Sequence, residues 1–398
     1  MRLPTPGFKS SRLREAREAR GLTGVSLEDI SGVSARLISN YERDRVSPSP
    51  ETLAVLASAL RMPIDFFLMP DRTLERGTIF NRSLAATTKR ARLRSDHRLT
   101  WLRDIADYLS NYVIFPEFNL PQLDVPADPL LLTNDDIEMA AADLRESWNL
   151  RRGPIANLVL LLENHGVIVA RDQLGAQDLE GKSELPARGR AFVFVGTDRG
   201  TPARWRFDAA HELGHLVLHS HVSEAIVRRP ENFSLIESQA HRFAAAFMLP
   251  AVEFGEELFA ANLDALRALK PRWKTSIAMM ITRMSDLGFI DEETKRKLWI
   301  SYSKRKWRRH EPFDDTMEPE IPRLLARSFE MTLQEGLQTA DDVKTALALE
   351  FDDIERLSSL PSGFFKAYAP VRTLRSVEQR TNADRVDAPA EVVQLRRR

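Results

Sequence analysis

The segment from Arg204 to His219 places the strongest constraint on the fold, because it contains the pattern His-Glu-x-x-His. On a helix, His211 and His215 are four residues apart and lie one above the other on the same face. Their imidazoles can then converge on one zinc ion, while Glu212 can take a proton from a water on the metal. The alternative is a helix whose histidines are merely solvated, but apolar residues around the motif favour a helix with a buried side.

A catalytic zinc site needs a third protein ligand and one open position. His221 follows six residues after the motif, but that geometry needs a glycine to turn the chain before the ligand, and the sequence has none there. His219 continues the same helical stripe, and one helix cannot close a tetrahedron with three successive histidines. A second helix over 236–250 is therefore expected to supply the ligand. It offers Glu237 and His241, and the residues alone leave both open.

The chain has no cysteine, so a metal must be held by histidine and carboxylate rather than by thiolate. Its net charge is zero, although residues 1–100 hold 18 Lys and Arg against 11 Asp and Glu. The first residues lack an apolar signal region, and no apolar run approaches the roughly 18 residues needed to span a bilayer. We expect a cytoplasmic protein with no membrane partner.

Residues 9–68 are typical of five short helices, because their apolar residues recur at helical spacing. Thr23 and Ser34 are suitable N-cap residues, and Pro48 and Pro50 separate the third helix from the fourth. Short helices this close in sequence predict a small all-α bundle.

Residues 69–133 are predicted to connect this bundle to the rest of the chain. The run 89–94 is basic and can be a solvated helix face, helical periodicity returns over 99–115, and four prolines follow between 116 and 129. We place the main domain boundary in the proline-rich part.

A mixed pattern of helices and strands begins at residue 134. Strands are predicted at 166–171 and 190–195, separated by a polar loop over 172–189. Helices are predicted at 134–148, 154–164, 205–220, 234–249, 252–268 and 275–287. The expected units are an α+β domain over 134–310, a helical C-terminal extension over 311–368 and a disordered tail over 369–398. Strand 190–195 is expected to present an edge beside the His-Glu-x-x-His helix, where an extended substrate could add by β-pairing.

Several stretches of this α+β region together resemble the ImmA/IrrE family of metallopeptidases. They are the segment 204–219, the run Glu237-x-x-Ala-His-Arg-Phe-Ala-Ala, the Met-Leu-Pro ending at Pro250, Trp273-Lys-Thr-Ser276 and the pair Leu287-Gly288. The resemblance covers roughly 134–300 and implies a zincin-like, gluzincin-type site in which Glu237, rather than His241, is the third zinc ligand. It also implies cleavage of a specific regulatory protein, often a DNA-binding repressor, in a stress or mobile-element response.

The N-terminal bundle resembles an XRE-type, lambda-repressor-like helix-turn-helix. The matching stretches are Ala19-Arg-Gly-Leu-Thr23, Gly32-Val-Ser34, Ile38-Ser-Asn-Tyr-Glu42 and Pro50-x-Thr-Leu53. Gly32 permits a tight turn before the recognition helix. One departure is Glu28, which stands where a small residue is usual. The alternative is a bundle retained for protein contacts.

Outward-facing residues of the recognition helix are the candidate DNA contacts. Arginine and asparagine suit guanine and adenine edges, and serine or arginine can hold phosphates. The six candidates are Ser34, Ala35, Arg36, Ser39, Asn40 and Arg43. Operator-type duplex DNA is the expected partner, and paired half-sites would call for a homodimer.

Together these features predict a zinc-dependent regulatory endopeptidase with a DNA-binding domain and a protein substrate. The alternative is a transcriptional regulator whose zincin-like domain acts as a sensor or dimerisation module without proteolysis. Retention of Glu212 favours the first, since zinc ligation alone does not need it.

Overall fold

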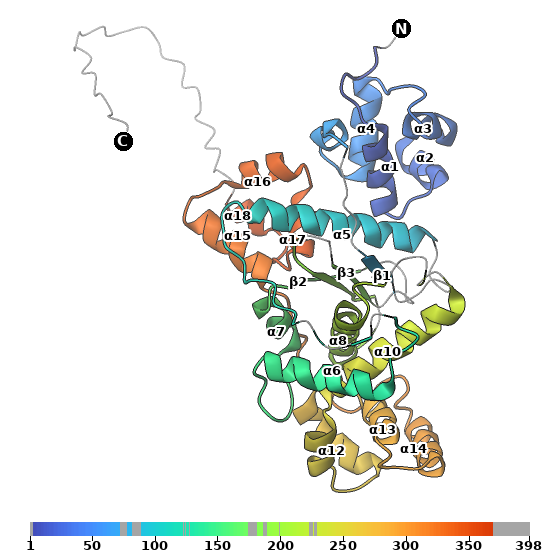
Figure 1. The fold of residues 1–398 in the computed structure, drawn as a ribbon. Coiled ribbons are helices and arrows are strands. Elements are labelled where there is room, and N and C mark those ends of the chain that lie inside the picture. The colour runs from blue at the N-terminus through green and yellow to red at the C-terminus, as the bar shows by residue number, and fades with distance from the viewer. Residues whose placement is uncertain are drawn as a thin grey trace, which may run out of the picture.

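A computed structural model describes residues 3–71, 78–81, 89–121, 123, 125–126, 128–173, 181–185, 189–198, 200–222, 226 and 229–368. It contains a helical N-terminal bundle, a mixed α+β region built around a small sheet, and a helical C-terminal region (Figure 1). The multidomain fold class predicted from the sequence is therefore confirmed. The predicted tail over 369–398 lies outside the described residues, and the predicted domain boundaries stay a prediction.

Four helices and a short 3-10 helix form the N-terminal bundle. They are α1 (Ser10–Ala19), α2 (Gly24–Ser31), α3 (Ala35–Glu42), α4 (Pro50–Leu60) and η1 (Ile64–Leu68). Thr23 and Ser34 cap α2 and α3 as predicted, since their side chains accept hydrogen bonds from backbone N–H groups of the first turns. Between these helices Gly32 has a φ of 70°, a left-handed conformation that suits glycine.

The sheet has four strands in the order β1-β3-β4-β2. They are β1 (Thr78–Asn81), β2 (Ile168–Asp172), β3 (Gly181–Leu185) and β4 (Phe192–Gly196). Strand β4 runs parallel to β2, while β3 runs antiparallel to both β4 and β1. The prediction that 190–195 forms an edge is therefore wrong, because β4 lies in the interior of the sheet.

Strand β3 lies within the stretch 172–189, which the sequence predicts to be a polar loop. That prediction is wrong here, because the charged side chains of β3 are buried rather than solvated. Lys182 and Glu184 are fully buried in β3, although a strand with alternating charged residues is typical of a surface. Each has an ion-pair partner on the long helix α5 (Lys89–Leu109): Lys182 pairs with Asp96, and Glu184 with Arg103. The partners lie more than 80 residues away in sequence, so local pattern does not reveal them.

Helix α5 covers one face of the sheet, and α8 (Pro202–Leu218) covers the other (Figure 1). In β4, Phe192 and Phe194 belong to the core shared with α5, whereas Val193 and Val195 belong to the core shared with α8. This alternation follows from the two-residue repeat of a strand. The predicted basic run at the start of α5 is only partly solvated, since Arg92 and Arg94 are half-buried.

The core on the α8 face is completed by seven further helices. They are α6 (Asn134–Ser147), α7 (Leu158–Asn164), α10 (Pro230–Met248), α11 (Ala251–Glu257), α12 (Leu263–Trp273), α13 (Ile277–Asp286) and α14 (Glu292–Lys304). The single helix predicted over 252–268 is in fact two, α11 and α12. Helix α6 begins at residue 134 as predicted, and Thr133 caps it through a capping box with Asp136.

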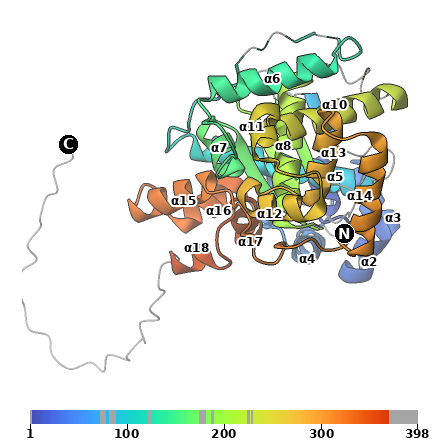
Figure 2. The ribbon, with the colours of Figure 1, turned by 90° about the horizontal axis from the view of Figure 1, so that it is seen from below.

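The C-terminal helices pack on the α5 side of the molecule. They are α15 (Leu324–Gln334), α16 (Ala340–Leu347), α17 (Phe351–Leu357) and α18 (Phe364–Ala367). Their apolar residues join those of the N-terminal bundle, α5 and one sheet face in a single core. Figure 1 shows α12–α14 at the opposite end of the α+β region from α15–α18, and in Figure 2 α15, α16 and α18 lie on the side away from α14. Within the described part of the chain, no helix has the length and apolar character needed to cross a membrane.

Candidate functional site

The first half of the site is built on α8, which is buried along most of its length. Pro202 occupies its first turn, where a missing N–H costs nothing, and the residues from Asp208 to Leu218 are all buried. His211 and His215 are fully buried, and their Nε2 atoms lie 3.0 Å apart. Two buried imidazoles directed at one point are costly unless something binds between them.

Helix α10 supplies the second half, because it packs closely on α8. A side chain at Gly214 would place its Cβ 3.1 Å from the Ala240 carbonyl oxygen and 3.1 Å from the Phe243 ring. Glycine on α8 and alanine on α10 therefore set the short distance between the helices. This approach brings Glu237 to the two histidines.

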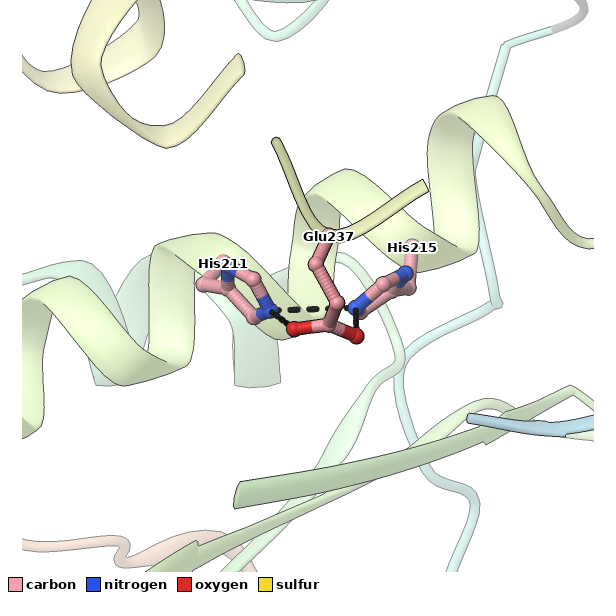
Figure 3. Close-up of side chains that lie close together, drawn as sticks. All are labelled: His211, His215 and Glu237. Atoms are coloured by element: carbon pink, nitrogen blue, oxygen red, sulfur yellow. Dashed lines mark hydrogen bonds and ion pairs between the residues drawn. The ribbon is translucent and has the colours of Figure 1, made fainter. Parts of the chain in front are cut away.

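Three side chains converge in Figure 3. Glu237 Oε2 lies 3.3 Å from His211 Nε2, and Glu237 Oε1 lies 3.3 Å from His215 Nε2. One potential ligand atom from each residue lies within 4.8 Å of the other two. Among the described residues, this is the one group of three or more histidine and acidic side chains close enough to hold a metal ion. Two imidazoles and a carboxylate form a donor set found in catalytic zinc sites.

A second layer of residues holds the His215 ring. His219 Nδ1 lies 3.2 Å from His215 Nδ1, and its Nε2 lies 3.0 Å from Gln239 Oε1. Gln239 in turn donates to the Pro129 carbonyl at 2.7 Å. Burial, with a smaller contribution from His215, lowers the pKa of His219 to about 3, so this ring is neutral. His219 therefore contacts Nδ1 of His215 and orients that ring so that the His215 Nε2 atom faces Glu237.

Glu212 is 1% exposed and lies against strand β3. A Cβ built on Gly181 would come within 2.6 Å of Glu212 Oε1. Glycine at the start of β3 therefore leaves the room that the Glu212 carboxylate occupies. Sequence reasoning missed both Gly181 and the supporting role of His219. The only local signal for His219 was its position four residues after His215.

The two rival ligands, His221 and His241, are not part of this converging group. The His241 ring centroid is 4.6 Å from that of His211 and 5.3 Å from that of Phe207, and His221 is exposed. His241 also lines a cavity of about 590 Å³ between α10 and α13, together with Phe207 and Trp299. This arrangement agrees with the choice of Glu237, although the ligand assignment itself stays a prediction.

The six candidate DNA contacts, which lie in α3 or at its ends, differ in their exposure. Ser34, Arg36 and Arg43 are exposed and Asn40 is half-buried. Ala35 and Ser39 line a cavity of about 440 Å³ shared with the first turn of α5. The DNA contacts also stay a prediction.

Glu28, the departure noted in the sequence, has a structural role. Its Oε2 accepts a hydrogen bond from the Ala35 backbone N–H at 3.0 Å. A carboxylate at this position stabilises the N-terminus of the recognition helix. Glu28 therefore stands in place of a small residue because its carboxylate caps the N-terminus of α3.

Polar contacts dock the N-terminal bundle on the rest of the molecule. Trp101 Nε1 donates to Glu15 at 2.8 Å, so α5 holds α1. Arg20 forms two hydrogen bonds with Asp353 of α17, at 2.5 and 2.6 Å. The bundle is therefore held by both α5 and the C-terminal helices.

Comparison with known proteins gives two family matches. Residues 13–67 match the helix-turn-helix family, and residues 162–285 match the peptidase M78 family, described as the IrrE N-terminal-like domain. No curated protein matches the chain. A solved structure described as a Mycobacterium tuberculosis transcriptional regulator is 19% identical, with a TM-score of 0.29; the match covers 48% of this chain and 51% of that one.

The two matches confirm both resemblances seen in the sequence. The helix-turn-helix match spans α1 to η1, and the peptidase M78 match contains the whole histidine and glutamate group. Such a pairing fits a regulator that carries a metallopeptidase-like domain. The chain thus joins a region that matches the helix-turn-helix family to a region that matches the peptidase M78 family, described as the IrrE N-terminal-like domain.

Proposed function

We propose that this protein is a DNA-binding regulator whose α+β domain is a zinc-dependent endopeptidase for a specific regulatory protein. The observation that carries the proposal is the convergence of His211, His215 and Glu237, with Glu212 beside them. A regulator acting on DNA in a stress or mobile-element response would work in the cytoplasm.

The buried residues fit a zinc ion. The donor set leaves one coordination position for water or substrate. The contact between His219 and His215 supports the fit, because metal-binding imidazoles usually use their second nitrogen in a hydrogen bond. The 3.0 Å approach of the His211 and His215 nitrogens supports it as well.

In this proposal Glu212 is the general base. A zinc ion bound to the group would supply Lewis-acid activation of water and of the substrate carbonyl. Glu212 would accept the proton of the attacking water at its carboxylate and deliver it to the leaving amide nitrogen. Its burial excludes bulk water from this transfer, and Gly181 leaves the space in which the carboxylate turns between the two partners.

Substrate identification provides the main test. Zinc-loaded protein and its Glu212→Gln variant are incubated with a lysate of the source cells, and new protein N-termini are labelled and sequenced. We expect one or a few cuts that occur only with the unmodified chain, and no digestion of casein. Removal of zinc by a chelator should stop the cuts, and added zinc should restore them. Identical N-termini from both proteins would reject proteolysis and favour the sensor alternative.

DNA binding is tested separately, because it does not depend on the peptidase. Arg36→Ala and Asn40→Ala should each cost about 1–3 kcal/mol of sequence discrimination. Substitutions in the basic run at 89–94 should instead weaken binding to all sequences alike and reduce its salt dependence. Equal losses on specific and random DNA for every variant would leave only non-specific binding.

A further inference from the structure

Strand β3 is the part of the sheet that lies next to the proposed catalytic residue. Strand β3 packs against α8, and Gly181 at its start is the residue against Glu212. A peptide that reaches Glu212 along the sheet must therefore pair with β3. The opposite side of β3 is already paired with β4, so only the side away from β4 can accept it.

That side of β3 is occupied by the chain itself. Strand β1 pairs with it in antiparallel register, from Thr78 opposite Leu185 to Asn81 opposite Lys182 (Figure 1). The register places the carboxyl end of β1 beside the start of β3, which is the end near Glu212. Strand β1 comes from the connector between the N-terminal bundle and α5, outside the region that matches the peptidase family.

We propose that the outer edge of β3 is the peptide-binding edge of the peptidase, and that β1 holds it closed until an extended substrate replaces it. The inference rests on the proposed function and deepens it. The backbone groups along one side of a strand can pair with only one neighbour, so β1 and a substrate exclude each other. The occupant expected in place of β1 is an extended protein segment running antiparallel to β3.

The strength of this closure follows from length and tethering. Strand β1 has four residues, so it contributes few ladder hydrogen bonds. Because it is tethered, its effective concentration at β3 is on the order of millimolar. A weakly binding peptide does not displace it at ordinary concentrations, whereas a cognate segment with more contacts does. The edge that a substrate competes for is therefore that of β3, and not the edge at 190–195 that the sequence predicted.

Two neighbouring proline variants, Ile79→Pro and Phe80→Pro, provide a matched pair. In an edge strand, successive N–H groups point alternately toward the neighbouring strand and toward solvent. Only one of the two prolines therefore removes a ladder hydrogen bond with β3, and the other is its control. A third variant, in which 78–81 are replaced by Gly-Ser-Gly-Ser, opens the edge without proline.

The probe is a fluorescent synthetic peptide with the sequence of residues 76–83, and its binding is followed by fluorescence anisotropy. All proteins are full-length and carry Glu212→Gln, so that the peptide is not cut. The ladder-breaking proline and the Gly-Ser variant should bind the peptide at least about tenfold more tightly than the parent and the control proline. Hydrogen exchange of the Gly181–Leu185 amides should rise in the same two variants and fall again with peptide.

Equal peptide affinity in all four proteins would overturn the inference, as would absence of binding in variants whose β3 amides have lost protection. The outcome is separable from the proposed function, because binding requires no cleavage. If the opened edge binds peptide but the same variants with Glu212 intact cut nothing, the edge is right and proteolysis is wrong. If a substrate is cut at the same rate with β1 paired or opened, proteolysis stands and the closure is wrong.

Discussion

The two faces of the central sheet differ in what their side chains contact. Toward α8, strand β3 presents Gly181, which leaves room for Glu212, and β4 presents valines that pack in an apolar core. Toward α5, the same β3 presents Lys182 and Glu184, which form buried ion pairs with that helix. One five-residue strand therefore contacts the Glu212 carboxylate on one side and forms ion pairs with helix α5 on the other.

This difference separates two kinds of constraint. On the α8 face, residue size is critical, because the site depends on short distances between helices and strand. On the α5 face, charge is critical, because a buried ion that loses its partner is strongly destabilising. Substitutions on the α8 face should therefore change zinc binding and cleavage, and substitutions on the α5 face should change stability and docking.

The largest effect is expected for the third ligand. Glu237→Ala should abolish stoichiometric zinc, with a loss in affinity of about 100-fold or more, since even residues behind metal ligands account for roughly 10–100-fold. His241→Ala, on the same helix, is the matched control and should retain zinc. Metal content after dialysis against a weak chelator measures both. Retention of zinc by the Glu237 variant and its loss from the His241 variant would reverse the assignment.

The next effect tests the α5 face. Arg98 of α5 and Asp172 of β2 form an ion pair in which both side chains are buried. Asp172→Asn or Arg98→Met should each cost about 3–5 kcal/mol, because each leaves a buried charge without its partner. The double variant Arg98→Met with Asp172→Leu should lose much less than the sum.

Denaturant unfolding of all three variants, with zinc content measured on the folded protein, checks this prediction. Zinc stoichiometry should stay at that of the parent chain. Loss of zinc in the folded single variants would show that the two faces of the sheet are coupled rather than separate.

An intermediate effect is expected for Gly181→Ala. The added methyl group displaces the Glu212 carboxylate without touching the histidines, so cleavage should fall by about 10- to 100-fold while zinc remains. Ser183→Ala, on the same side of β3, adds no atom and is the control. Initial cleavage rates and metal content decide the outcome, and unchanged cleavage by the Gly181 variant would remove Glu212 from the proposed mechanism.

The smallest effect concerns docking of the N-terminal bundle. Burial raises the pKa of Asp353, but the hydrogen bond and charge of Arg20, with help from Arg356, hold it below its ordinary value. Stability from this pair is therefore present above the unfolded pKa of about 3.9 and is lost as pH falls through the lower folded pKa.

Asp353→Asn should weaken docking at neutral pH by about 1 kcal/mol, since Arg20 is partly exposed. Amide exchange of α1 as a function of pH measures this. In the parent, the α1 amides should be less protected from exchange at acid pH. In the Asp353→Asn variant, this loss of protection should be smaller, because no carboxylate at 353 is protonated. The same pH profile in both proteins would mean that this ion pair does not hold the bundle.

The same contrast between faces explains how far the sequence could predict the structure. The His-Glu-x-x-His helix, the second helix with its two candidate ligands and the caps Thr23 and Ser34 depend on neighbours within a few turns, so local spacing revealed them. The choice of Glu237 over His241 came from the resemblance to the peptidase family. The all-α bundle and the mixed α+β pattern followed from the same local periodicities, whereas the zincin-like class came from the family resemblance.

Strands β1 and β3 were missed because their stability depends on distant partners. Lys182 is predicted to be a surface residue because the sequence does not show its ion-pair partner, Asp96 of α5. The pairing of 78–81 with 182–185 joins segments about 100 residues apart. The contact between Gly181 and Glu212 follows from the same missed strand. Predicting this site completely requires the sheet, not the motif alone.

The core on the α5 side also determines which surface the nascent chain exposes during synthesis. Apolar residues of α5, including Trp101 and Leu102, share this core with the C-terminal helices, and Arg20 pairs with Asp353 across 333 residues of chain. At a synthesis rate of about 5–20 residues per second, α5 leaves the ribosome tens of seconds before its C-terminal cover is made. During that interval the nascent chain exposes the apolar face of α5, which makes it a client for chaperones. Chains that stop before α15 would lack this whole C-terminal cover.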